Sequence, residues 1–366
     1  MKIVVYPVGE NPYQNLLYNE MKKDNKIKIK YLRNKFIDTD HAFTIGMPIF
    51  PFRLLYYRLT GWNILHLHWL SPFVLPIKNR YFRYVSSLYI LSFLIILKMI
   101  GFKLFWTLHE TLPQEDEFHN DKMIRTIVSK FSDIKIFHSP AALEEANQLG
   151  FNTKNAHIIP HGNYNTSYPN KISKEKARVK LKLNRNDFVF LFFGMIKQYK
   201  GIDNLLETFE KLLQNNKKIK LIIAGECTNK QLNEMILNYK TRYKNNILLY
   251  LHHIDDKNIQ NFFNASDVVV LPFKQNTTSG SAVLAMSFGK PIIAPLLGNI
   301  IDLPQNVGLF YNPHDSDGLL KNMSSAINKK KNLVNIGDLG LQYAKSLSWN
   351  QIASQTKASF KQLFVK

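Results

Sequence analysis

The sequence predicts an α/β protein with two doubly wound domains, each built on a mostly parallel sheet. Short apolar, β-rich runs alternate with helical stretches along the chain, which is the order of βαβ units. At 366 residues the chain is too long for one ordinary core. The alternation stops in the stretch 160–169, where Gly, Pro and Asn dominate as a linker requires. The expected domains are therefore residues 1–165 and 166–348, followed by a C-terminal helix, 349–366, that could pack back on the first domain.

In the first domain, the helical stretch 79–100 leaves two interpretations open. Its apolar run, 85–97, is shorter than the ~20 residues that a membrane-spanning helix needs. It could be a buried helix between two strands, or a helix in the bilayer interface with its basic and aromatic flanks against lipid. The other expected helices are 12–23 and 140–149, and the expected strands are 2–6, 27–32, 64–68, 103–108, 134–138 and 156–159.

The second domain begins with a helix for which Ser173 is the expected N-cap. An apolar strand, 188–193, follows and is closed by Gly194. Successive apolar residues in this strand and the later ones indicate burial on both faces. Two such domains leave a cleft between them, and ligands of doubly wound sheets bind at the carboxyl ends of the strands. The further strands are expected at 219–224, 247–251, 267–271 and 291–294, and a last amphipathic helix begins at Trp349.

The net charge of +21 indicates an anionic partner. Anionic lipid and a phosphorylated substrate both suit it. Nucleic acid is disfavoured, because the chain has no Arg-rich arm, zinc-finger spacing or RNA-binding aromatic signature. A single cysteine, Cys227, excludes an internal disulfide and a cysteine-based zinc site. Residues 1–6 read as a first strand rather than a signal peptide, so we expect a cytoplasmic location.

The stretch 273–291, called the anion loop below, predicts an anion site. A strand, 267–271, leads into small polar residues and then into a helix start, where unpaired N–H groups and the helix dipole favour negative charge. A glycine in this position lets a phosphate approach the backbone. The ligand class is a phosphorylated or nucleotide-linked metabolite, although an ordinary βα turn would have the same pattern. The candidate residues are Thr277, Thr278, Ser279, Gly280 and Ser281.

Four ordered segments of the second half resemble the nucleotide-sugar-binding domain of GT-B-fold glycosyltransferases of group 1, a superfamily that includes family 4-like enzymes. The first, 193–206, is similar to the segment that holds the donor diphosphate, and the second, 221–226, to the strand and Gly turn that follow it. The third, 254–272, resembles the lining of the base pocket, and the fourth is the anion loop. Beside the anion loop, the resemblance assigns donor binding to Gly194, Lys197, Lys200, Gly225 and Ile254.

The first half is similar in pattern to the acceptor domain of the same fold, which implies two Rossmann-like domains facing a cleft. Asn11-Pro12-Tyr13-Gln14, with Thr107-Leu108-His109, resembles bacterial enzymes that build exopolysaccharide and capsule repeat units, including β-mannosyltransferases. The resemblance implies transfer of a hexose from a GDP- or UDP-linked donor to a saccharide or glycolipid acceptor. The protein would be peripheral on the inner face of the plasma membrane. No metal or other cofactor is required, because lysines and a helix terminus can stabilise the leaving diphosphate.

The chain departs from the retaining branch of this family. That branch carries two glutamates on the loop and helix, where this sequence has Asn276 and Leu284. Met195 likewise stands where the family has a basic residue, and Lys197 could replace it. These departures favour an inverting mechanism. A retaining hexosyltransferase, and a catalytically silent subunit that stabilises a partner transferase, stay open as alternatives.

An inverting transfer needs a base for the acceptor hydroxyl. The polar loop that follows strand 103–108 offers Glu110 and Glu115, and His109 could act as the base or orient the sugar. Glu117, in contrast, is expected to belong to a solvated acidic run.

Three further residues, Asn11, His68 and His161, are expected on the acceptor side or at the hinge. His66 shares one face of its strand with His68, because side chains alternate across a strand. The sequence offers no third ligand at a suitable spacing, so no metal site is expected here.

Overall fold

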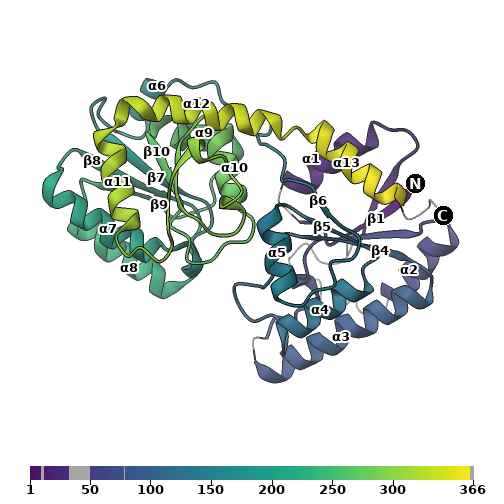
Figure 1. The fold of residues 1–366 in the computed structure, drawn as a ribbon. Helices are drawn as coiled ribbons and strands as arrows, with labels where there is room; N and C mark the ends of the chain where they lie inside the picture. The colour runs from purple at the N-terminus through teal and green to yellow at the C-terminus, as the bar shows by residue number, and fades with distance from the viewer. Residues whose placement is uncertain (10–11, 33–49, 78, 363–366) are drawn as a thin grey trace. The chain divides into compact units, whose positions relative to one another are not determined.

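The structure, a computed structural model, describes residues 1–9, 12–32, 50–77 and 79–362, so the predicted Asn11 lies outside the described residues. It contains two six-stranded parallel sheets with helices on both faces, which confirms the predicted fold class (Figure 1). Contacts divide the chain into an N-terminal unit, Met1–His161 with Trp349–Lys366, and a C-terminal unit, Gly162–Ser348.

The sheet of the N-terminal unit is parallel throughout. Its strand order reverses at β1: the second strand is added on one side of β1 and all later strands are added on the other side. The first strand pairs with the second on one side and with the third on the other, so the loops that follow β1 and β3 start side by side and lead to opposite edges of the sheet. Ligands of doubly wound sheets bind at such a switch point. Across the sheet the order is β2 (Lys28–Tyr31), β1 (Lys2–Tyr6), β3 (Ile64–Leu67), β4 (Lys103–Leu108), β5 (Ile134–Phe137) and β6 (Ala156–Ile158).

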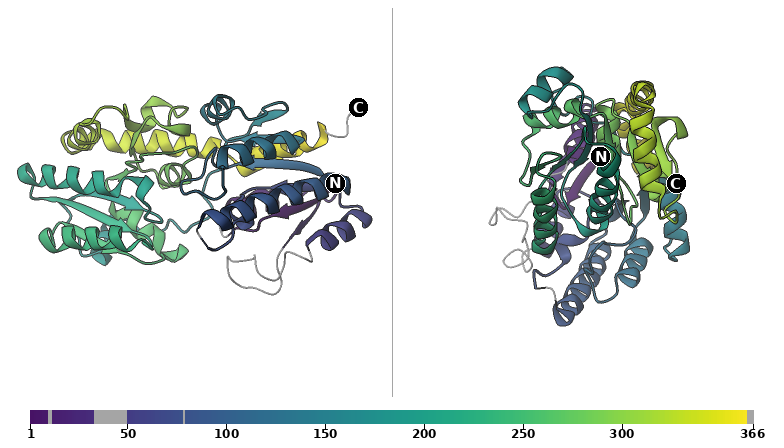
Figure 2. Two further views of the ribbon diagram at one scale, coloured as in Figure 1. Left: turned by 90° about the horizontal axis from the view of Figure 1, so that it is seen from below. Right: turned by 90° about the vertical axis from the view of Figure 1, so that its left-hand side faces the viewer.

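Helices cover both faces of this sheet. On one face, α1 (Pro12–Lys22) packs against α13 (Trp349–Gln362), and Leu17 and Phe360 lie in the same buried cluster. The C-terminal helix therefore packs on the N-terminal unit, and Figure 2 shows it from two further directions. The opposite face is covered by α2 (Phe50–Leu59), α3 (Arg80–Met99), α4 (Asp121–Phe131) and α5 (Pro140–Gln148).

The sheet of the C-terminal unit is also parallel and has its switch point between β10 and β7. The strands after β7 add to one edge, and the strands after β10 add to the other. Across the sheet the order is β12 (Gly308–Tyr311), β11 (Ile292–Pro295), β10 (Val268–Val270), β7 (Phe188–Phe193), β8 (Ile219–Ala224) and β9 (Ile247–Tyr250).

Alternating residues of β7 show how the second sheet is covered. Phe190 lies in a cluster with α7 (Ile202–Asn215), α8 (Lys230–Arg242) and α11 (Gly318–Asn328). Phe193, which points to the other face, contacts Phe263 with 4.9 Å between ring centroids. That phenylalanine belongs to α9 (Asp256–Ala265) and stacks on Phe288, at the end of α10 (Gly280–Ser287). The remaining helices pack outside these two, α6 (Lys174–Lys180) on α9 and α12 (Lys330–Ser346) on α10.

Helix α3 is buried along one row of residues and exposed along another. Its inward row, including Ile90, Phe93 and Leu97, is buried in the core, whereas its outward row, including Tyr84 and Leu88, is apolar but exposed. Within the described residues, it is the one helix long and apolar enough to cross a membrane by length and composition. A helix that is apolar on all sides is buried in a large core or in contact with lipid.

Helices α2 and α4 were not predicted. In α4 the buried apolar residues Ile124 and Val128 lie among charged and polar residues, so the apolar pattern extends over only a short stretch. The clearest local indication of this helix is its N-cap, where the Asn120 side chain accepts from the backbone N–H of Met123.

Candidate functional site

The candidate donor site lies at the switch point of the C-terminal sheet. The segment that begins at Gly194 follows β7, and the anion loop follows β10, which is the neighbouring strand. Parallel strands have their carboxyl ends at the same edge, so the tertiary structure brings these two segments together where ligands of such sheets bind.

Three of the predicted donor residues, Gly194, Lys200 and Ser281, meet at this edge. A Cβ atom added to Gly194 would lie 3.4 Å from Nζ of Lys200 and 3.9 Å from Oγ of Ser281. Because Gly194 has no Cβ, its backbone leaves space next to the ammonium group of Lys200 and the hydroxyl of Ser281, which come from different segments.

The turns around this edge are packed backbone against backbone. Gly201 ends the short 3-10 helix Gln198–Lys200 with φ +71°, and a Cβ there would lie 1.9 Å from the carbonyl oxygen of Pro272, after β10. A Cβ at Gly225, after β8, would lie 2.2 Å from the carbonyl oxygen of Gly194. Since no side chain fits at either position, the two glycines fix the backbone that carries Lys200.

The anion loop begins α10 with a capped N-terminus. The Ser279 side chain accepts from the backbone N–H of Ala282 at 3.1 Å, so this hydroxyl is used within the fold. The hydroxyl oxygen of Thr278 is buried and has no partner among the described residues. An unpaired buried hydroxyl costs about 1–3 kcal/mol, so this group is suited to hydrogen bonding with a ligand.

Asn276, at the position where the sequence analysis expects a glutamate in the retaining branch, ties the anion loop to the next loop. Its Nδ2 donates to the carbonyl oxygen of Leu297 at 3.1 Å and to Oδ1 of Asn299 at 3.0 Å. Asn299 in turn accepts from the N–H of Ser279 at 2.9 Å and donates its own N–H to the carbonyl oxygen of Thr277 at 2.9 Å. The asparagine side chain therefore has a structural role at this position.

Lys200 is the more constrained of the two predicted lysines. Burial, with a smaller contribution from the charge of Lys197, lowers the pKa of Lys200 to about 8. Lys197 is partly exposed at the start of the 3-10 helix, and Ile254 is buried just before α9. Burial and a like charge destabilise the charged form of a lysine. Such a lysine is a candidate for binding an anion, since an opposite charge would restore its ordinary pKa.

In the N-terminal unit, the loops after β1 and β3 also meet at their switch point. A Cβ added to Gly9 would lie 2.8 Å from the ring of Trp69, and this ring stacks on His109 with 4.4 Å between centroids and 14° between planes. The side chain of Gln14 fixes the first loop, accepting from the N–H of Gly9 and donating to the carbonyl oxygen of Pro7, each at 2.8 Å.

Several strand-end histidines of this unit form a cluster with a tyrosine of α1. We call Tyr18, His66, His68, His109 and His138 the histidine array, because each contacts another member through a ring nitrogen or hydroxyl. The sequence analysis did not include Tyr18 or His138. The indication for His138 was available, since β3, β4 and β5 each have a histidine at or just after their carboxyl end.

The array is neutral, and all of its members except the partly exposed His109 are buried. Burial lowers the pKa of His66 and of His138 to about 3. Burial, assisted by the neighbouring imidazoles, also lowers the pKa of His68 and of His109 well below the ordinary value. The predicted hinge residue His161 lies beside the array, with its ring 5.7 Å from that of His138.

The acidic loop after β4 differs from the sequence expectation at Glu117. Its side chain is only 16% exposed, and its Oε2 lies 2.9 Å from the guanidinium of Arg125, a buried residue of α4. The same guanidinium lies 3.4 Å from Oε1 of Glu110, whereas Glu115 is exposed. The prediction of a solvated Glu117 was wrong because α4 places a buried cation under the loop.

Burial raises the pKa of Glu117 to about 7, and the attraction of Arg125 opposes this only in part. A carboxylate that titrates near neutral pH is suited to general base catalysis. Glu117 therefore joins Glu110 and Glu115 as a candidate base.

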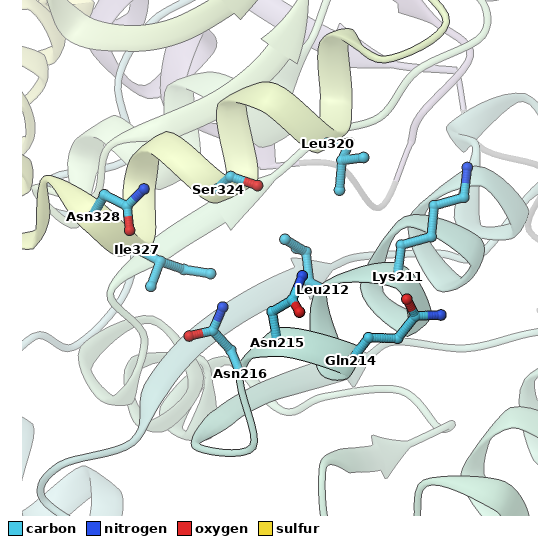
Figure 3. Close-up of a pocket in the computed structure, with 9 residues that line it drawn as sticks. All are labelled: Lys211, Leu212, Gln214, Asn215, Asn216, Leu320, Ser324, Ile327 and Asn328. Carbon is cyan, nitrogen blue, oxygen red and sulfur yellow. The ribbon is translucent and has the colours of Figure 1, made fainter.

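A separate groove of the C-terminal unit does not belong to this site. It has a volume of about 480 Å³ and lies between the C-terminal ends of α7 and α11, lined by residues that include Asn215 and Ile327 (Figure 3). Lys200 precedes the other end of α7, and a helix of 14 residues is about 20 Å long.

Residues 173–340 match the model of a family described as glycosyl transferases group 1. A GDP-mannose:glycolipid 4-beta-D-mannosyltransferase of Xanthomonas campestris pv. campestris is 22% identical over 252 residues, which are 68% of this chain and 66% of that protein. The mannosylfructose-phosphate synthase of Agrobacterium fabrum is 22% identical over 68% of this chain and 57% of its own length. The chain thus matches less than two thirds of the length of these relatives.

Solved structures match over nearly the full length. Sucrose-phosphate synthase from Thermosynechococcus elongatus has a TM-score of 0.75 at 17% identity, covering 100% of this chain and 99% of that one. Anabaena HepE in complex with UDP has a TM-score of 0.72 at 16% identity, covering 99% of this chain and all of that one. These likenesses concern the fold.

Proposed function

We propose that the chain is a group 1 glycosyltransferase, built on the GT-B fold, and that it transfers a hexose from a nucleotide sugar to a saccharide acceptor. The observation that carries the proposal is the meeting of Gly194, Lys200 and Ser281 at the switch point of the C-terminal sheet. An ammonium group, a hydroxyl and a helix N-terminus at one edge are the groups that stabilise a leaving diphosphate.

The donor is proposed to carry GDP or UDP. A relative named for GDP-mannose and a similar structure in complex with UDP support the two candidates equally. The acceptor is proposed to be a lipid-linked saccharide used in surface polysaccharide synthesis. The names of relatives that act on a glycolipid or in capsular polysaccharide synthesis support this class.

We further propose an inverting mechanism with a carboxylate of the loop after β4 as the base. Asn276 supports inversion, because it stands at a glutamate position of the retaining branch and is used in hydrogen bonds within the loop. Glu117 is the strongest candidate for two reasons. Its pKa of about 7 lets it accept a proton near neutral pH, and its ion pair with Arg125 fixes its position.

The test is a transfer assay with UDP-, GDP- and CDP-sugars and short saccharide or lipid-linked acceptors, followed by the anomeric configuration of the product. We expect one donor to be consumed in an acceptor-dependent manner with inversion. Glu117→Gln should lower kcat by on the order of 10²- to 10⁴-fold, as expected for a lost general base. A product with retained configuration would refute inversion, and no turnover with any donor, together with copurification of a second transferase, would indicate the silent subunit instead.

We also propose that the protein binds the inner face of the plasma membrane as a peripheral protein, through a surface on α2 and α3 of the N-terminal unit. In α2 the exposed apolar residues fall at i, i+3, i+4 and i+7, so they form one stripe along the helix. These two helices pack together. The exposed apolar residues are Phe52, Leu55, Tyr56 and Leu59 on α2, and Tyr81, Tyr84, Leu88, Ile95 and Met99 on α3.

The charge of the same region matches an anionic bilayer. Residues 50–103 contain seven Lys and Arg residues and no Asp or Glu. Arg58 of α2 lies beside Gly101, where an added Cβ would be 3.4 Å from its Nε, so one of these cations adjoins the C-terminal end of α3. An apolar stripe flanked by cations is typical of helices that lie in the interface of anionic membranes.

Vesicle flotation tests this surface. With phosphatidylglycerol vesicles, the double variant Leu59→Ser and Met99→Ser should bind at least about tenfold more weakly than the unmodified protein, because two large apolar side chains no longer enter the interface. The matched control is Val179→Ser with Val334→Ser, which removes equally exposed apolar side chains from the C-terminal unit. Equal loss in both variants, or equal binding to phosphatidylcholine at any salt concentration, would contradict the proposed surface.

A further inference from the structure

The histidine array is a continuous chain of hydrogen bonds that crosses three strands and reaches α1. The hydroxyl of Tyr18 lies 2.6 Å from Nδ1 of His66 and 2.7 Å from Nε2 of His68. Nδ1 of His68 lies 3.1 Å from Nε2 of His109, and Nδ1 of His109 lies 3.3 Å from Nε2 of His138. Both histidine–histidine bonds join Nδ1 of one ring to Nε2 of the next. Each of the four imidazoles has a hydrogen-bond partner at both of its ring nitrogens.

The hydrogen bond at one end of this chain fixes which nitrogen donates and which accepts in each of the others. Nδ1 of His138 lies 2.9 Å from the carbonyl oxygen of Ile159, which can only accept, so Nδ1 carries the proton. In a neutral imidazole the other nitrogen is then an acceptor, and it must receive Nδ1–H of His109. By the same step, Nε2 of His109 must receive Nδ1–H of His68.

The hydroxyl of Tyr18 has the same donor and acceptor roles between His68 and His66. Nε2 of His68 is now an acceptor, so the hydroxyl of Tyr18 donates to it, and the oxygen of that hydroxyl accepts Nδ1–H of His66. Nε2 of His66 in turn accepts from the hydroxyl of Thr107 at 2.8 Å. Each bond has one proton and no bond has two, so a single backbone carbonyl determines all four tautomers.

We propose that His138 is the positioning residue that holds His109 neutral, with its proton on Nδ1 and its lone pair on Nε2, and that His68, Tyr18 and His66 continue the same chain. His109 is the member that reaches the surface at the switch point, where it stacks on Trp69. Its N–H is committed to His138 and its Nε2 accepts from His68 in the free protein, so a substrate can use only the acceptor nitrogen, by replacing His68. A sugar hydroxyl bound there donates its hydrogen bond to Nε2 in place of His68. This last statement rests on the proposed transferase function, whereas the tautomers do not.

Nitrogen-15 spectra of the histidine side chains test the tautomers in the unmodified, full-length protein. At pH 7.5 we expect the four imidazoles to be protonated on Nδ1 only, assigned by comparison with single His→Gln variants. His138→Phe removes the bond to the carbonyl oxygen of Ile159 and should give His109 and His68 a mixture of tautomers, although His138 has no hydrogen bond to His68. The control Thr107→Val removes the terminal bond alone and should change His66 while leaving His109 as it was.

Activity is the second readout. His138→Phe should lower kcat/KM for the acceptor by on the order of fivefold to tenfold, as expected for misplaced hydrogen bonds, and should leave donor binding unchanged. An Nε2–H tautomer at His68 or His109 in the unmodified protein would overturn the proposal, as would an unchanged His109 spectrum in a folded His138→Phe variant. If that variant does not fold, the spectrum of the unmodified protein and the Thr107→Val control still decide. A protein with no transferase activity but with the expected spectra would refute the proposed function and keep the chain.

Discussion

Replacing Lys200 with methionine is expected to slow glycosyl transfer by on the order of 10²-fold, because the loss of one charge-stabilising donor at a leaving group has effects of this size. Methionine keeps the length of the side chain beside Gly194 and removes the ammonium group. Lys197→Met should have a smaller effect, of roughly tenfold, since Nζ of Lys200, and not that of Lys197, lies within 4 Å of a Cβ added at Gly194. Steady-state kinetics with the natural donor measure both changes.

The pH dependence of diphosphate binding provides a second measurement on the same group. The pKa of Lys200 is about 8 in the free protein and should rise when an anion binds. Affinity for UDP or GDP should therefore be constant below pH 8 and fall above it, and this fall should be absent in Lys200→Met. The control is Lys211→Met, an exposed position on α7. If Lys200→Met retains kcat/KM within twofold, the donor site has been misassigned.

Acid should destabilise the N-terminal unit at a pH where ordinary carboxylates remain ionised. The pKa values of His66, His68, His109 and His138 are lowered by burial, so the unfolded chain takes up protons near pH 6.5 while the folded unit does not. The sign follows: the stability is fully present above pH 6.5 and is lost as the pH falls toward about 3. Each such histidine contributes a slope of up to about 1.4 kcal/mol per pH unit.

No carboxylate, lysine or arginine contributes to these shifts, and the charged forms that do are the imidazoles of the array and of His161, which makes the prediction specific to this cluster. The titratable groups packed on it are Tyr13 and Tyr18 of α1 and His161 after β6, and α13 adds the rings of Trp349 and Phe360. A carboxylate nearby would have stabilised an imidazolium and reversed the effect.

Urea unfolding followed by tryptophan fluorescence measures this change. All four tryptophans of the chain lie in the N-terminal unit, so their fluorescence reports on that unit alone. Between pH 6.5 and 5 the free energy of unfolding should fall steeply, and His138→Gln should reduce the slope by up to about 1.4 kcal/mol per pH unit. His119→Gln, at an exposed histidine, should not change the slope. A free energy of unfolding that is flat over this range would show that the array is protonated in the folded state.

Part of the candidate site could be predicted from local sequence. Gly194, Lys200 and the anion loop each follow a continuous apolar strand, and strands with apolar residues on both faces are buried in parallel sheets. Ligands bind at the carboxyl ends of such strands, so residues just after them were reasonable candidates before the strand order was known. Ser279 was a candidate for ligand binding, but its hydroxyl caps α10, a detail that depends on the backbone geometry of the turn.

Glu117 and Tyr18 illustrate what local sequence could not show. Glu117 lies among other acidic residues and has the pattern of a solvated run, and its burial is decided by Arg125 of a helix that the sequence did not predict. Tyr18 lies on α1, 48 residues before His66, and no periodicity links the two. Contacts of this kind arise because parallel pairing brings together strand ends that are far apart in the chain.

The sequence by itself determined that the chain forms two doubly wound α/β units and that an anion loop follows an apolar strand of the second, because hydrophobic period, turn residues and strand-end polarity are local properties. Only the tertiary structure decided which strand ends are neighbours, and therefore that Lys200 meets Ser281, that four histidines share one hydrogen-bond chain, and that the last helix covers the first unit. The physical reason is that strand order and helix docking depend on which apolar faces bury one another, and this choice is made between segments distant in sequence.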